Sequence, residues 1–411
     1  MAADDEGTAR MRRHLHRARH ALTAVAVAAV TCAGLLAGCS SPTQQAPVEP
    51  RPLDTSPSYS VPPTALRLSG DPMVLHVAPD GNDAGPGTED APFATIGKAA
   101  SVARPGMTVL VADGTYEGVV ITVAAGRADA RITYLAENKW GAKLVADAED
   151  VVETEQFGSE GAVWHNYGDY VDIRGFDISG TTTDGLMDTG SYVRLLENRV
   201  YGATESCLST WAEDYALHDI DIIGNVVFGC GETELHHGIY PSHPRGTISN
   251  NISYDNSGYG IHCWHNCNEL VITNNVVFNN KEGGILIGQG DNPNFGDVPA
   301  DGMLVANNIA VDNGRFGIRE SGATGPDNQY LHNNVWDNHD DGIDLITGTE
   351  VQTITTDPAF VDYERNGTGD YRLQPWSPNV DAGVVDGAPM LDFNGIDRPQ
   401  GGGVDIGAYE R

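Results

Sequence analysis

Three carboxylates lie within five residues near the end of the chain, in the segment Asp340-Asp341-Gly342-Ile343-Asp344. Clustered carboxylate oxygens are ligands that Ca²⁺ prefers, and a glycine inside the segment lets the backbone turn so that the side chains converge. The segment therefore predicts a calcium site formed by Asp340, Asp341 and Asp344. A calcium ion with a purely structural role, or a simple acidic turn, is compatible with the same pattern.

A second group of residues is suited to proton transfer. The segments GIYPSHP (238–244) and GIHCWHNC (260–267) bring His237, Tyr240, His243 and His262 onto neighbouring repeats. Imidazole and phenol groups can donate and accept protons near neutral pH or after a modest pKa shift. We therefore take His237, Tyr240 and His262 as candidate catalytic residues.

A third possibility is hydrolysis by a pair of carboxylates. Glycosidases place two such groups about 5–10 Å apart across the sugar. Glu282 and Glu320 lie on neighbouring repeats and are the candidate pair. Glu320 follows an outward-facing residue, so it is expected to point inward, which weakens the pair.

A repeat positions all of these residues. Six segments begin with an asparagine followed by a short apolar run, and the gaps between these asparagines are 27, 26, 24, 33 and 26 residues. Such a period is typical of a solenoid, in which each coil buries its apolar face against its neighbours. We expect the asparagines to stack in a ladder, and the expected members are Asn225, Asn251, Asn275, Asn308 and Asn334.

Alignment of the Gly-Ile pairs at 238, 260, 284, 317 and 342 shows which side chains share one outer surface. Because the isoleucines point inward, the residue after each must point outward. The three columns beside the pairs are Tyr240/His262/Leu286/Arg319/Asp344, His237/Tyr259/Gly283/Phe316/Asp341 and His236/Gly258/Glu282/Arg315/Asp340. We call these columns the strip, and it adds Glu282, Arg315 and Arg319 to the candidate catalytic residues.

Both ends of the folded part resemble a known family. The segments VAPDGNDAGPGTEDAPFATIGKAA (77–100) and PGMTVLVADGTY (105–116) are similar to the first coil and capping helix of right-handed parallel β-helix proteins of the pectate-lyase superfamily. The segments 357–361, 377–383 and 401–410 resemble the C-terminal tail of secreted members. The resemblance implies an all-β, right-handed parallel β-helix with an N-terminal helical cap and first coil (73–125), coils (126–356) and an irregular C-terminal cap (357–411).

The same resemblance suggests a chemistry. The pattern D-D-G-x-D is similar to the calcium site of calcium-dependent pectate lyases, in which the ion binds the substrate carboxylate and a base removes the C5 proton. No lysine follows Lys281 to act as that base. Related lyases use an arginine, so Arg315 and Arg319 are the candidates here. The histidine segments are distantly similar to alginate epimerases, but Tyr240 stands where their motif has an acid, which argues against epimerisation.

The N-terminus predicts export. A basic segment containing Arg12, Arg13, Arg17 and Arg19 precedes an apolar stretch that is too short and interrupted for a spanning helix. It ends in Leu36-Ala37-Gly38-Cys39, which resembles a lipobox. This resemblance implies a signal peptide (1–38), a lipid anchor on Cys39 as the sole membrane attachment, and an extracellular protein on a Pro/Ser/Thr-rich tether (39–72).

The cysteines and the charge set further limits. In an exported chain, the even number formed by Cys207, Cys230, Cys263 and Cys267 favours two disulfides, with Cys207–Cys230 and Cys263–Cys267 as the expected pairs. The alternative is a metal site that uses His262 and His265 beside Cys263.

A net charge of −33 makes nucleic-acid binding improbable, and it would also repel a polyanionic glycan unless a cation bridges the two.

Together these features predict a monomeric, extracellular carbohydrate-active enzyme that acts on a polysaccharide. Calcium-assisted β-elimination of a uronate polymer is the first hypothesis. A glycoside hydrolase on the same fold and a non-catalytic glycan-binding protein are the alternatives.

Overall fold

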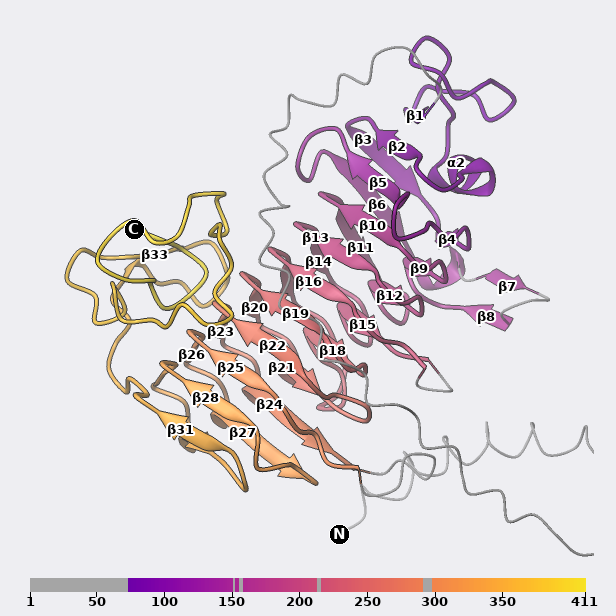
Figure 1. Cartoon of the computed structure of the whole chain (residues 1–411). Helices are drawn as coiled ribbons and strands as arrows, with labels where there is room; N and C mark the ends of the chain where they lie inside the picture. Colours follow the sequence, from indigo (N-terminus) through magenta and orange to yellow (C-terminus); the bar gives the residue numbers. More distant parts are fainter. Residues whose placement is uncertain (1–72, 151, 155–157, 213–215, 291–297) are drawn as a thin grey trace, which may run out of the picture. The chain divides into compact units, whose positions relative to one another are not determined.

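The computed structural model describes residues 73–150, 152–154, 158–212, 216–290 and 298–411 (Figure 1). The predicted signal peptide, the tether and the lipidated Cys39 lie outside these residues. Within the described part, no helix combines the length and the apolar composition needed to cross a membrane.

Three parallel sheets form the body of the protein, and successive strands of each sheet come from successive coils. The first sheet has eleven strands in the order β1 (Val74–Val77), β2 (Thr108–Val111), β5 (Ile132–Ala136), β10 (Val171–Arg174), β13 (Arg194–Leu196), β16 (Asp221–Ile223), β19 (Gly246–Ser249), β22 (Leu270–Thr273), β25 (Leu304–Ala306), β28 (Gln329–Leu331) and β31 (Thr349–Val351).

The second and third sheets have nine strands each. The second is β29 (Asn334–Trp336), β26 (Ile309–Val311), β23 (Val276–Phe278), β20 (Ile252–Tyr254), β17 (Val226–Phe228), β14 (Arg199–Tyr201), β11 (Asp177–Gly180), β6 (Ala142–Ala146) and β3 (Gly114–Glu117). The third is β30 (Asp341–Asp344), β27 (Phe316–Gly322), β24 (Gly283–Gln289), β21 (Tyr259–Cys263), β18 (Ile239–Pro241), β15 (Leu208–Thr210), β12 (Leu186–Asp188), β9 (Trp164–Asn166) and β4 (Val120–Thr122).

Each coil thus passes through the first, second and third sheets in turn, which is the parallel β-helix that the repeat predicted. Apolar side chains from all three sheets stack inside in one continuous core. The helix α2 (Ile96–Val102) packs Ile96, Ala99 and Ala100 against the first coils, and the Thr95 side chain caps it by accepting from the Lys98 N–H. The remaining elements are a 3₁₀ turn (Ala148–Asp150) and the antiparallel pairs β7 (Val152–Thr154) with β8 (Gly158–Glu160) and β32 (Phe360–Asp362) with β33 (Asp370–Leu373).

A ladder of buried asparagines joins the coils at the turn before the second sheet. The backbone N–H of each donates to the side-chain oxygen of the asparagine one coil later, as Asn225 does to Asn251 at 2.9 Å. The ladder runs through Asn198, Asn225, Asn251, Asn275 and Asn308. Its last member is Asn333, so the prediction of Asn334 was wrong. Asn334 instead begins β29 and donates to Thr356 and Asn379.

A second ladder explains the glycine of each Gly-Ile pair. Asn256, Asn280, Asn313 and Asn338 stack at the turn between the second and third sheets. A Cβ on Gly260 would lie 2.7 Å from Asn280 Nδ2 and 2.2 Å from Val277 Cγ1, closer than any side chain tolerates. Glycine is therefore required wherever this ladder passes beneath the start of a third-sheet strand.

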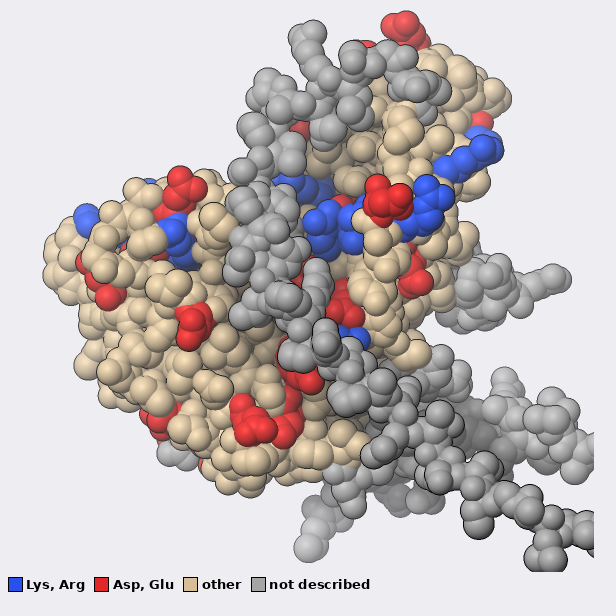
Figure 2. All heavy atoms as spheres, in the orientation of Figure 1, with Lys and Arg blue, Asp and Glu red and all other residues tan. Residues whose placement is uncertain are grey.

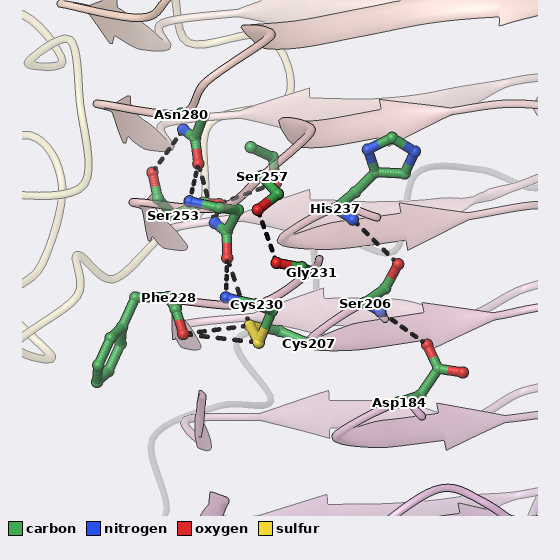
Figure 3. Close-up of a disulfide and its surroundings, with 12 residues drawn as sticks. Asp184, Ser206, Cys207, Phe228, Cys230, Gly231, His237, Ser253, Ser257 and Asn280 are labelled. Atoms are coloured by element: carbon green, nitrogen blue, oxygen red, sulfur yellow. Dashed lines mark hydrogen bonds between the residues drawn. A yellow bond between two sulfur atoms is a disulfide. The ribbon is translucent and has the colours of Figure 1, made fainter. Parts of the chain in front are cut away.

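One disulfide replaces a rung of the second ladder (Figure 3). Register pairs Leu208 with Ile239, so Cys207 occupies the glycine position of its coil. Cys230 takes the asparagine position, and its backbone N–H donates to Asn256 Oδ1 at 3.2 Å. The expected Cys207–Cys230 bond is present. The expected Cys263–Cys267 bond is absent: both thiols are buried and free, and the Cys267 thiol donates to the Pro241 carbonyl instead.

The C-terminal segment is irregular, as expected, but it does not cover the last coil as a lid. It packs against the outer face of the second sheet (Figure 1), where Tyr371 contacts Phe278 at a ring-centroid distance of 4.6 Å. The residues buried there are Ile252, Tyr254, Val276, Phe278, Ile309 and Val311 of the sheet with Phe360, Tyr371, Leu373, Ile406 and Ala408 of the segment. The terminal strand β31 stays exposed.

Basic side chains on the face shown in Figure 2 gather in a band across the N-terminal coils. The arginines of these coils pair with acids on adjacent strands: Arg194 with Asp172, and Arg199 with Asp177. The band is therefore balanced by neighbouring carboxylates in a chain that is acidic as a whole.

Replacement of Asn251 by alanine tests the first ladder. The Asn225 N–H and the Ile222 carbonyl would both lose a buried partner, at a cost of about 1–3 kcal/mol for each group. We expect the free energy of unfolding in denaturant to fall by about 2–4 kcal/mol. Asn394→Ala, at an exposed position, is the control, and equal effects of the two substitutions would contradict a stabilising ladder.

Reduction of the Cys207–Cys230 bond tests its role as a substitute rung. The bond closes a loop between cysteines 23 residues apart, for which loop-closure entropy predicts about 3 kcal/mol. We expect the midpoint of denaturation to fall in reductant, and the Cys207→Ala/Cys230→Ala protein to be insensitive to it. If reductant leaves the denaturation midpoint of the wild-type protein unchanged, the ladder hydrogen bonds hold these coils together without the disulfide.

Candidate functional site

The register of the third sheet confirms the alignment that defines the strip. The isoleucines at 239, 261, 285, 318 and 343 pair with one another from coil to coil. His262 consequently pairs with Leu286, Leu286 with Arg319, and Arg319 with Asp344. The candidate residues therefore lie on β18, β21, β24, β27 and β30 or in the turns just before these strands.

Histidine and aromatic rings form one half of the strip. His237 and His262 contact each other, with His262 Nδ1 2.5 Å from His237 Nε2. The ring of Tyr240 lies 5.2 Å from His237 and 5.5 Å from His262 between centroids. The structure thus brings together all three of the candidates that sequence suggested for proton transfer.

Burial keeps both histidines neutral. Burial first, and then His262 and His236, lower the pKa of His237 well below its ordinary value. Burial followed by His265 lowers the pKa of His262 to about 3. A neutral imidazole has one nitrogen that donates and one that accepts a hydrogen bond, so the pair can act in proton transfer without carrying charge.

Arginines and carboxylates form the other half. Arg315 lies between Glu282, at 3.2 Å, and Asp340, at 3.4 Å, and Arg319 lies 3.5 Å from Asp344. The hydrogen bonds with Glu282 and then Asp340 raise the pKa of Arg315. This environment suits Arg315 as a fixed cation and disfavours it as a base.

Tyr259 joins the two halves. Its ring centroid lies 5.1 Å from that of His262, and the positive charges of Arg319 and Arg315 act on its hydroxyl and favour a lower pKa. Burial, followed by the charge of Glu282, raises the pKa of this hydroxyl. A Cβ on Gly283 would lie 2.8 Å from the Tyr259 ring, so this glycine makes room for it. Tyr259 was in the predicted column but was not recognised as a candidate; the unusual Gly283-Gly284 pair above it was the available signal.

Trp264 was also missed. A Cβ added to Gly288 would lie 2.4 Å from the Trp264 indole, and one added to Gly290 would lie 2.8 Å from it. The ring therefore packs against the backbone at the glycine-rich end of β24. Its centroid is 5.5 Å from that of His262. Residues 291–297, which follow Gly290, lie outside the described part.

Asp184 extends the site toward the N-terminus (Figure 3). Asp184 precedes Gly185 in its coil, just as His237 precedes Gly238. Ser206 connects Asp184 to His237: the His237 N–H donates to Ser206 Oγ, and the Ser206 N–H donates to Asp184 Oδ1. Burial, and then Glu205, raise the pKa of Asp184 to about 7. Its coil lacks the Asn and Gly-Ile signature, so the alignment did not reach it.

The carboxylates proposed for calcium do not converge on a common point among the described side chains. Asp340 contacts Arg315 and His339, and Asp344 contacts Arg319. The side chain of Asp341 lies outside the described part. Among the side chains that are described, no group of three or more His, Cys, Asp or Glu is arranged to hold a metal ion. The calcium site stays a prediction.

Glu320 cannot form a catalytic pair with Glu282, because it is buried and 1% exposed. Burial alone would raise its pKa, but hydrogen-bond donors outweigh burial and lower it. The donors are the backbone N–H groups of Ile346, Thr347 and Gly348 and the side chains of Thr324, Asn328 and Tyr330. Glu320 is therefore a structural carboxylate that holds the turn after β30.

Comparisons with known proteins agree with this architecture. A family model described as a Pel9A-like right-handed β-helix region matches residues 75–220, and a model of the right-handed β-helix region matches residues 157–298. No curated protein sequence matches the chain.

Among solved structures, pectate lyase Pel9A is 16% identical with a TM-score of 0.50, over 82% of this chain and 96% of that one. The A-module of mannuronan C-5 epimerase AlgE6 from Azotobacter vinelandii is 14% identical, over 62% and 73%, with a TM-score of 0.46. An alginate lyase from a Paenibacillus species is 16% identical, over 63% and 92%, with a TM-score of 0.38. At these identities the likeness concerns the fold alone. With three parallel sheets wound coil upon coil and both family models matching, the chain is a right-handed parallel β-helix protein.

Proposed function

We propose that this protein is an exported, lipid-anchored polysaccharide lyase that binds a uronate polymer along the strip and cleaves it by β-elimination. The observation that carries the proposal is the neutral His237–His262 pair beside Tyr240 and Tyr259, with the charge of Arg319 acting on the Tyr259 hydroxyl. The shared fold with a pectate lyase supports the class of reaction.

The reaction needs three things of the protein. A cation must offset the substrate carboxylate so that the adjacent C5 proton becomes acidic, a base must take that proton, and the oxygen leaving C4 must gain one. As the C5–H bond breaks, its electrons form the C4=C5 double bond and the C4–O bond breaks. Arg319 and Arg315 supply the positive charge, and Tyr240, beside the neutral His262, is the group that takes the C5 proton and returns it to the oxygen leaving C4.

The arginines are available to a substrate although they contact acids. Arg315 and Asp340 are 47% and 38% exposed, and Arg319 and Asp344 are 29% and 47% exposed. Exposed ion pairs contribute about 0–1 kcal/mol, so a substrate carboxylate can replace the protein carboxylates at low cost. Added Ca²⁺ would help by screening repulsion between two polyanions, and we keep calcium assistance as part of the proposal.

Hydrolysis is less well supported. Glu320 is buried, and Arg315 stands between Glu282 and Asp340, where the glycosidic bond would have to lie.

A panel of uronate polymers, assayed with calcium and with chelator, tests the proposal. We expect near-ultraviolet absorbance from unsaturated products, and a loss of about 100-fold or more in kcat/KM for Arg319→Ala, because a preorganised charge is removed. Arg372→Ala, which alters an exposed ion pair in the C-terminal segment, is the matched control. Reducing ends without absorbance would indicate a hydrolase, and binding without products would indicate a glycan-binding protein.

The pH profile gives a second test. Because the pKa of His262 is lowered from 6.5 to about 3, acidification through pH 6.5 should leave it neutral, and the acid limb of kcat/KM attributable to histidine should lie well below 6.5. Charging a histidine whose folded pKa is depressed favours unfolding, so stability falls as pH drops below 6.5. Circular dichroism at each pH separates that loss from catalysis.

His339→Gln, at an exposed histidine, should leave the profile unchanged. If the kcat/KM of the folded protein instead falls around pH 6.5, a histidine of the site becomes charged at its ordinary pKa, which contradicts the prediction.

A further inference from the structure

The protonation of His237 is fixed by the backbone. His237 is 2% exposed, and the N–H of Tyr259, one coil further, donates to its Nδ1 at 3.1 Å. A ring nitrogen that accepts a hydrogen bond cannot itself carry a proton. In a neutral His237 the proton must therefore lie on Nε2.

That proton determines the state of the next ring. His237 Nε2 lies 2.5 Å from His262 Nδ1, so His237 donates and His262 accepts. A neutral His262 that accepts at Nδ1 must carry its own proton on Nε2. One backbone N–H thus sets the tautomer of two side chains in sequence.

The Nε2–H of His262 is the group at which the relay ends. This nitrogen is buried and has no hydrogen-bond partner in the part of the chain that the structure describes. Ring centroids of Tyr240, Tyr259 and Trp264 lie 5.5, 5.1 and 5.5 Å from that of His262. An unsatisfied buried donor is unfavourable in the folded protein, so this N–H needs an acceptor, which a water or a bound molecule can supply.

We propose that His237 is a positioning residue that holds His262 in the Nε2–H tautomer, so that His262 acts as a neutral hydrogen-bond donor to the substrate carboxylate and not as a base. Negative charge accumulates on this carboxylate as the C5 proton leaves, and a fixed donor there stabilises the transition state. A neutral imidazole is known to serve as such an electrophile. The assignment of the donor role rests on the proposed function, and it leaves Tyr240 as the base.

Histidine-selective ¹⁵N labelling and long-range ¹H–¹⁵N NMR of the free protein test the relay without any substrate. We expect His262 to give the signature of a proton on Nε2 with Nδ1 as acceptor. A proton on Nδ1 of His262 would overturn the proposal. This readout needs no variant and does not depend on whether the protein is a lyase.

Two variants at one position separate tautomer control from packing. In His237→Gln the amide nitrogen falls near the place of Nε2 and can still donate to His262. In His237→Asn the shorter side chain keeps a partner for the Tyr259 N–H but does not reach His262. We expect the Gln variant to retain the Nε2–H signature and the Asn variant to lose it.

The same pair tests the donor role. With a cleavable uronate polymer, we expect kcat to fall by about 10–100-fold more in His237→Asn than in His237→Gln, with similar KM, as found when the partner that orients a functional histidine is removed. Equal kcat values in two folded variants would overturn the role. If no polymer is cleaved, the proposed function fails, and the NMR signatures still decide the relay.

Discussion

Hydrogen bonding between coils in parallel register is the constraint on which the rest of this protein depends. Strands in one sheet are about 4.8 Å apart, so each residue of a coil lies directly above its counterpart in the preceding coil. The asparagine ladder fixes this register at the turns, where the side-chain oxygen of one coil accepts the N–H of the other. The strip follows from that register: residues 22 to 33 positions apart in sequence become neighbours on one surface.

The second asparagine ladder packs directly against the backbone at the start of the third-sheet strands. The Gly-Ile glycines lack the Cβ that would collide with Asn256 and Asn280. The residue before each glycine lies at the entry to the third-sheet strand, where His237 and Tyr259 are buried within the strip. The disulfide between Cys207 and Cys230 satisfies the same geometry by a covalent bond, with one cysteine at each of the two ladder positions.

The site combines groups that burial neutralises with groups that solvent keeps charged. His237 and His262 lie against the sheet and have lowered pKa values, whereas Arg315 and Arg319 extend toward solvent and contact carboxylates. Tyr259 spans the boundary between them. Acid–base groups and cations thus lie on neighbouring coils of one face, an arrangement that the proposed lyase reaction would use.

The sequence by itself determined the fold and the membership of the strip, because a period near 25 residues and the Gly-Ile pairs encode register directly. It also predicted the Cys207–Cys230 bond. It could not choose between Asn333 and Asn334, since adjacent asparagines fit the pattern equally well. Only the tertiary structure decided that Glu320 is buried, that Cys263 and Cys267 are not bonded, and that the ring of Tyr259 lies against that of His262. These outcomes depend on side-chain direction and on partners in other coils, and a one-dimensional alignment contains neither.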